Sequence, residues 1–246
     1  MTRPGRRTSA ATGSTVVHQL AAQIRRDIAL GILAPDSRLN IEGLKRERKV
    51  SHPSIREALA LLAGEGYVLA EGNKGYRVLA SSLEDLRDTT RLRAEMECLG
   101  FRWSVARADT DWRASVVAAY HTLSEVEADM GTDPRAFAVE WDDRNRQFHF
   151  ALIGNCGSPR LLDTVATLYD LTRRYRLMAY AQNTSSRPDW LVRSPREHGA
   201  LKDHALAGDA EAGEAALRAH ITKSFAEPHM AVLTFPEGTA KTSSAG

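Results

Sequence analysis

The sequence has little cysteine and no long apolar run. Its two cysteines, Cys98 and Cys156, lie far apart along the chain, which excludes a disulfide-stapled miniprotein and is typical of a reducing compartment. No apolar stretch approaches the roughly 20 residues that cross a bilayer. The first residues, MTRPGRRTSAATGS, lack the apolar segment of a secretory signal. We therefore expect a cytoplasmic protein with no membrane partner.

The composition indicates a folded chain with an uneven charge distribution. Hydrophobic residues make up 43% and charged residues 26% of the 246 residues, which excludes a disordered or collagen-like chain. Residues 1–80 hold 13 Lys and Arg against 7 Asp and Glu, a net of +6, whereas residues 81–246 hold 20 against 24, a net of −4. A basic module on an acidic body predicts that the first part meets a polyanion.

The first 80 residues predict a winged helix-turn-helix domain at 14–80. Apolar residues recur at helical spacing, Ser51 can cap the third helix, and two β-prone runs flank an Asn/Gly-rich turn. The order of three helices and a hairpin, together with the positive charge, favours DNA binding through the third helix. The predicted elements are a disordered tail at 1–13, helices at 17–28, 41–48 and 52–65, and a hairpin at 67–79.

The rest of the chain predicts helices alone. Short links that contain Gly, Pro and Asp separate six apolar-periodic segments, which favours an antiparallel bundle over residues 84–230. The fold class is therefore mainly α, with a winged helix-turn-helix followed by an all-α bundle and a second disordered tail at 236–246. The predicted helices of the bundle are 83–108, 111–130, 133–154, 158–182, 193–207 and 209–228.

The basic module resembles a known family of DNA-binding proteins. Residues 51–59 (SHPSIREAL) are similar to the recognition-helix signature of the GntR family of bacterial transcription regulators. Residues 39–44 (LNIEGL) and the wing at 72–78 (GNKGYRV) match the same family in order and spacing. The resemblance covers about residues 15–228, and the helical part looks like the FCD effector domain of the FadR subfamily. The matching residues there are Arg93 to Glu97, Phe148, His149, Gly154, Asn155, Leu161, Glu197, His198, Gly208, Asp209, Ala212, His220 and Ile221.

The resemblance implies a homodimer that binds an inverted-repeat operator, acts as a repressor and is released by a small organic acid. An Arg fork such as Arg56 can hold a guanine edge bidentately or clamp a phosphate. Arg77 and the positive run from Lys45 to Lys49 add charge near the same face. The alternatives are a surface ion pair of Arg56 with a neighbouring Glu and a merely solvated Lys45–Lys49 face. The candidate DNA-binding residues are Arg46, Ser51, His52, Ser54, Arg56, Asn73 and Lys74, with His52 standing where the family usually has Arg.

Three histidines of the helical part match metal positions of the family. His149, His198 and His220 lie on separate predicted helices, and neutral imidazoles suit transition metals. The resemblance thus implies a divalent metal, Zn or Ni, with Asn145 at the fourth position, where the family has Asp. The alternative is a polar pocket in which the histidines bind an anionic effector directly.

The candidate effector-binding residues are Arg93, Tyr169 and Arg173. By resemblance Arg93 faces the same pocket, where a buried cation would pair with a carboxylate of the effector. The alternative for Arg93 is a salt bridge to Glu97, four residues further along the helix.

Two other functions compete with that of a regulator. A metal-dependent hydrolase would need a general base, but the sequence has no H-E-x-x-H motif, Asn145 cannot accept a proton, and Glu197 is expected to point elsewhere on its helix. An architectural, non-specific DNA binder would explain the positive charge but not a large helical domain. We therefore expect a transcription regulator and not an enzyme.

Overall fold

The structure is a computed structural model that describes residues 9–80, 82–130, 134–182 and 189–226. The chain divides into two compact units, and the division falls between Ala80 and Ser82. No helix of the described residues is long and apolar enough to cross a membrane.

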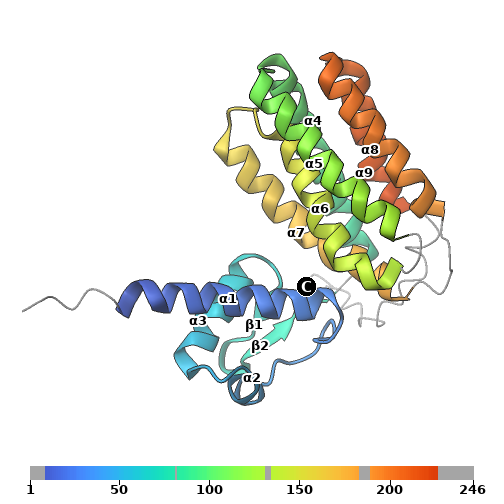
Figure 1. The fold of residues 1–246 in the computed structure, drawn as a ribbon. Helices are drawn as coiled ribbons and strands as arrows, with labels where there is room; N and C mark the ends of the chain where they lie inside the picture. The colour runs from blue at the N-terminus through green and yellow to red at the C-terminus, as the bar shows by residue number, and fades with distance from the viewer. Residues whose placement is uncertain (1–8, 81, 131–133, 183–188, 227–246) are drawn as a thin grey trace, which may run out of the picture. The chain divides into compact units, whose positions relative to one another are not determined.

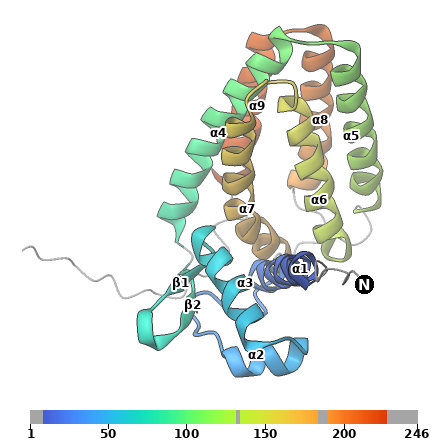
Figure 2. The same cartoon turned by 90° about the vertical axis from the view of Figure 1, so that its left-hand side faces the viewer.

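The first unit is a winged helix-turn-helix, as the sequence predicts (Figures 1 and 2). Two antiparallel strands, which pair Val68 with Val78, form the wing. Helices α1 and α3 pack on each other, and fully buried side chains such as Ile24, Ile55 and Leu59 form the core. The elements are α1 (Ser9–Ala29), α2 (Ile41–Arg48), α3 (His52–Gly64), β1 (Val68–Ala70), a 3₁₀ turn η1 (Gly72–Lys74) and β2 (Tyr76–Val78).

The predicted tail at 1–13 is wrong in its second part, because α1 begins at Ser9. The segment 9–13 reads SAATG, which has no apolar periodicity, so the helix extends beyond the part that its sequence pattern marks. Residues 1–8 and the tail predicted at 236–246 lie outside the described residues.

The local sequence explains how α2 and α3 begin. The side chain of Asn40 accepts a hydrogen bond from the backbone N–H of Gly43 at 2.9 Å, and Ser51 accepts one from the N–H of Ser54 at 3.2 Å. Such caps satisfy N–H groups that have no partner in the first turn of a helix. Lys49 adopts a left-handed conformation (φ 53°) after α2 and turns the chain towards Ser51. Each of these two caps fixes the residue at which its helix begins.

The second unit is a bundle of six helices within the described residues (Figure 2). Most helix bounds agree with the prediction to within a few residues. The predicted start of the fifth helix at 193 is wrong, because α8 begins at Asp189 and carries Pro195 in its interior. The helices are α4 (Leu83–Ala106), α5 (Thr110–Asp129), α6 (Pro134–Ile153), α7 (Pro159–Gln182), α8 (Asp189–Ala207) and α9 (Ala210–Ala226).

The interior of the bundle is partly polar. Apolar side chains such as Leu86, Phe101 and Phe148 are fully buried, but so are several charged and histidine side chains. Buried polar groups need partners inside the protein. This polar interior is therefore where a binding site of the bundle is expected.

Candidate functional site

Three histidines converge in the interior of the bundle. His149 comes from α6, His198 from α8 and His220 from α9. All three are buried, and one nitrogen of each lies within 4.8 Å of the others. The rings of His198 and His220 are 4.6 Å apart between centroids. We call these three residues the histidine cluster; their role as metal ligands stays a prediction.

A glutamate holds the outer ring nitrogen of every histidine in the cluster. Nδ1 of His149 lies 2.6 Å from Glu97, and Nδ1 of His198 lies 2.7 Å from Glu127. Nδ1 of His220 lies 2.7 Å from Glu197. An Nδ1–H that donates to a carboxylate leaves Nε2 with its lone pair, which is the arrangement of metal-binding histidines in proteins.

The inner nitrogens fit a metal ion. Nε2 of His198 and Nε2 of His220 are 3.2 Å apart. If Nδ1 of each of these two histidines carries the proton, the lone pairs of their Nε2 atoms face one another. Two nitrogens at about 2.0–2.1 Å from one tetrahedral ion would be separated by about 3.3 Å. Nε2 of His149 is buried and has no hydrogen-bond partner in the described part of the chain. A cation among these atoms would satisfy all three.

Burial keeps His149 and His220 in the neutral form that binds metals. It lowers the pKa of His149 to about 4, although Glu97 acts in the opposite direction. It also lowers the pKa of His220 to about 3, again against its glutamate. Burial alone would raise the pKa of Glu97, but the positive charge of Arg93 and the hydrogen bonds from Arg93 and His149 outweigh it and hold that pKa at about 2. Neutral imidazoles beside ionised carboxylates favour a cation.

Asn145 lies one turn before His149 on α6. Its Nδ2 donates to the Tyr169 hydroxyl at 2.7 Å, while its Oδ1 is buried and accepts from none of the residues that the structure describes. An unsatisfied buried carbonyl oxygen is costly. This oxygen is the atom that Asn145 could offer to a metal.

Arg93 lies beside the cluster but is already paired. Its Nε donates to Glu97 at 2.5 Å, its Nη2 lies 3.4 Å from Nδ1 of His149, and its guanidinium lies over the ring of Tyr169 at 4.3 Å. The salt bridge to Glu97, which was the alternative for Arg93, is therefore present. Arg173 instead pairs with Asp142 at 2.9 Å and with Asp143 at 2.5 Å. The effector roles of Arg93, Tyr169 and Arg173 stay predictions.

The sequence did not reveal that glutamates hold the histidines of the cluster. Glu127 comes from α5, far from His198 in sequence, and no pattern marked it. The expectation that Glu197 points elsewhere is wrong, because its carboxylate reaches His220 on the neighbouring helix α9. Glu97 was expected only as a partner of Arg93, and it contacts both Arg93 and His149.

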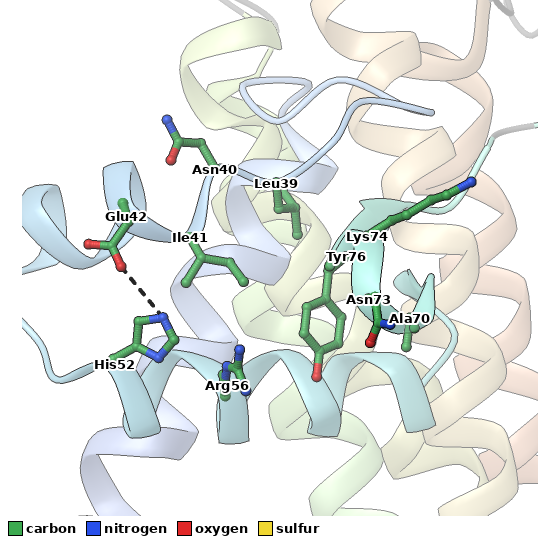
Figure 3. A pocket seen from close by; sticks show the side chains of 12 residues that line it. Leu39, Asn40, Ile41, Glu42, His52, Arg56, Ala70, Asn73, Lys74 and Tyr76 are labelled. Carbon is green, nitrogen blue, oxygen red and sulfur yellow. Dashed lines mark ion pairs between the residues drawn. The ribbon is translucent and has the colours of Figure 1, made fainter.

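A groove lies between α2, the recognition helix α3 and the wing of the first unit (Figure 3). It has a volume of about 650 Å³, and Arg56, His52, Asn73 and Lys74 are among the residues that line it. Arg56 is exposed, and no ion pair to it occurs among the described residues. The alternative of a surface pair with a neighbouring Glu is therefore absent, and the guanidinium can reach a ligand.

Both serines among the predicted DNA-binding residues form hydrogen bonds within the first unit. The Ser51 side chain caps α3, and its Oγ lies 2.8 Å from Oγ of Ser54. Arg46 is exposed at the end of α2, and Asn73 and Lys74 are exposed in the 3₁₀ turn of the wing. The DNA-binding role of all seven candidates stays a prediction.

Other basic side chains near the groove support the fold. Arg77 donates to Glu71 at 2.9 Å and to the backbone oxygen of Asp36 at 2.6 Å, so it braces the wing instead of extending from it. Arg48 pairs with Asp27 of α1, both largely buried. Arg48 is therefore not part of a free basic run, whereas contact of Arg77 with DNA stays a prediction.

The fold and the two sites define a winged-helix protein with a helical ligand-binding domain. Residues 17–78 match the family of bacterial regulatory proteins, gntR family, and residues 88–223 match the FCD domain. The chain therefore belongs to the GntR family and carries an FCD domain. It is a DNA-binding transcription regulator and not an enzyme, and the comparisons give no support to a metal-dependent hydrolase.

Several regulators are similar to this chain over most of their length. The HTH-type transcriptional regulator BphR of Paraburkholderia xenovorans is 39% identical over 82% of this chain and 80% of its own. The HTH-type transcriptional repressor GlaR of Escherichia coli is 32% identical over 80% of this chain and 89% of its own. The solved structure of E. coli McbR/YncC has the same fold, with a TM-score of 0.70 and 19% identity over 86% of this chain and 95% of its own.

Proposed function

We propose that this regulator is a repressor that binds an inverted-repeat operator as a homodimer in the cytoplasm. The observation that carries the proposal is the exposed guanidinium of Arg56 in the groove beside the wing, which has no ion pair with any residue that the structure describes. In this proposal α3 enters the major groove and Arg56 reads a guanine, while Asn73 and Lys74 of the wing contact the backbone or the adjacent minor groove. Arg46 and the first turn of α3 add phosphate contacts.

We further propose that the histidine cluster holds a divalent metal, Zn or Ni. His149, His198 and His220 would supply neutral nitrogens, and Asn145 would supply Oδ1. The three glutamates would orient the rings. The bound metal would supply a Lewis-acid centre to which an anionic ligand can bind.

The effector in this proposal is a small organic acid bound beside the metal. Arg93 and Tyr169 lie next to His149, so they are placed to contact such a ligand if Arg93 exchanges part of its contact with Glu97. Arg173 would contribute only by leaving Asp142 and Asp143. A ligand that prefers the DNA-free arrangement by about 1–3 kcal/mol would suffice to shift operator occupancy.

A footprint on DNA that flanks the gene of this protein tests the proposal. We expect protection of two half-sites about one helical turn apart, and loss of protection when a small carboxylate is added to protein loaded with Zn or Ni. Binding with a steep salt dependence but no preferred site would favour the architectural alternative and contradict the proposed repressor.

Replacing Asn145 with aspartate is expected to tighten metal binding and to weaken the metal-free protein. A carboxylate is a better ligand than an amide for a divalent cation, so we expect the affinity for Zn to rise by about ten-fold, which corresponds to about 1.4 kcal/mol. Without metal, the buried charge lacks a cation and lowers the melting temperature. Titration against a chromophoric chelator and thermal unfolding with and without chelator measure the two effects.

An unchanged Zn affinity in the Asn145→Asp variant would contradict the place of residue 145 among the ligands. Gln147→Glu on the same helix serves as the control, because it introduces the same charge at a residue that pairs with Arg144 on the exposed side of α6. That variant is expected to leave Zn affinity unchanged.

A further inference from the structure

An acidic residue lies in the groove that the recognition helix shares with the wing. Glu42, in the first turn of α2, is the one acidic side chain among the described residues that line this groove. Its side chain is 69% exposed. DNA phosphates repel a carboxylate, so an acidic group weakens binding unless it has a particular partner on the DNA. Its position therefore calls for an explanation.

Glu42 faces His52, the first residue of the recognition helix. Oε1 of Glu42 lies 3.5 Å from Nε2 of His52, and Figure 3 shows the two side chains pointing toward one another across the gap between α2 and α3. The other carboxylate oxygen of Glu42 lies 3.3 Å from Nζ of Lys45. Both helices begin at side-chain caps, so the two first turns hold the pair in place.

The chemistry of the pair selects its partner on DNA. An ionised carboxylate only accepts hydrogen bonds, and the donors in the major groove are the amino groups of cytosine and adenine. Glu and Asp match the cytosine N4 amino group. A protonated imidazole carries an N–H on both ring nitrogens, so one can face the carboxylate while the other donates to the guanine O6 or N7 of the same pair. At an A·T pair, the thymine methyl group would instead face two polar side chains.

We propose that Glu42 and His52 together read one G·C base pair in each half-site. Glu42 accepts from the N4 amino group of cytosine, and His52 donates to guanine. Lys45 is a positioning residue that holds the second oxygen of Glu42. This inference rests on the proposed placement of α3 in the major groove, and it adds a base contact that Arg56 does not make.

The test compares the sequence preference of four proteins by sequencing DNA selected from a random pool. They are the full-length wild type and the variants Glu42→Gln, His52→Ala and Glu47→Gln. Glu47 is the matched control, because it lies on α2, is 66% exposed and does not line the groove. Both Glu→Gln changes remove one negative charge and should strengthen non-specific binding alike.

We expect Glu42→Gln and His52→Ala to lose the preference for G·C at the same base pair, each by roughly ten-fold. Glu47→Gln is expected to keep the wild-type preference at every position. Glu42 is exposed and His52 is half-buried, and equal melting temperatures will show that the variants are folded.

Three results would overturn the inference. The first is an unchanged base preference in Glu42→Gln. The second is a loss of preference at different base pairs in Glu42→Gln and His52→Ala. The third is a wild-type preference for A·T at the base pair where these variants lose their preference. A wild type that selects no sequence at all would instead overturn the proposed operator binding on which the inference rests.

Discussion

Replacing Arg56 with alanine is expected to remove sequence-specific DNA binding and to leave the fold intact. Arg56 is exposed and has no ion pair among the described residues, so its loss leaves no buried group without a partner. A bidentate contact to guanine contributes about 1–3 kcal/mol of discrimination. Two half-sites double this value, so operator affinity should fall by at least about 30-fold relative to random DNA. Binding titrations on both DNAs measure the ratio.

Arg56→Lys is the matched control for charge. Lysine keeps the positive charge but lacks the planar fork that matches a guanine edge. We therefore expect Arg56→Lys to bind random DNA as the wild type does, with the same salt dependence, and to lose most of the operator preference. If Arg56→Ala retained full operator affinity, α3 would not read DNA through this residue.

Replacing His198 with glutamine is expected to remove the metal from the bundle. His198 is fully buried and is held between Glu127 and His220. Changing residues that only orient a ligand costs about 10–100-fold in metal affinity, so loss of the ligand itself should cost more. Zn at 100 times its Kd should stabilise the wild type by about 2.7 kcal/mol, which raises the melting temperature by about 5–10 °C. The variant should show no such rise.

A second variant distinguishes the loss of a metal ligand from the loss of the glutamate that orients it. Glu127→Gln should keep the metal with affinity reduced by about 10–100-fold, because Glu127 orients His198 and also accepts a hydrogen bond from Trp141 Nε1, and is not itself a ligand. His204→Gln is the control, since it makes the same substitution on α8 at a residue outside the cluster. Metal content after dialysis and thermal unfolding give two independent readouts. Full metal content in His198→Gln would show that the cluster is not the metal site.

Local sequence signals predicted the elements of this fold well. Apolar periodicity marked α1 and α3, and Ser51 caps α3 as the sequence predicts. The first residues of α1 and α8 were missed for a related reason. Helix ends without a capping signal depend on packing and on neighbouring segments, which short-range patterns do not contain.

Charged residues were the least predictable part of the candidate sites. Arg77 and Arg56 are both basic residues near the wing and the recognition helix, yet Arg77 pairs with Glu71 while Arg56 extends into the groove. Similarly, Arg93 was expected to face an effector, and it contacts Glu97 and His149. The choice between a structural and a functional role depends on whether an opposite charge lies within about 4 Å in the folded chain.

By itself, the sequence determined the order of the helices, the wing, the division into a basic and an acidic part, and the presence of three histidines on three helices. Those features follow from periodicity, turn residues and composition, all of which act over short stretches of chain. Only the tertiary structure decided that Glu97, Glu127 and Glu197 each hold one histidine, and that Glu42 meets His52. Such pairs form between side chains on different helices. A charged side chain that is buried or lies in a groove pairs with the polar group that helix packing brings within hydrogen-bond distance.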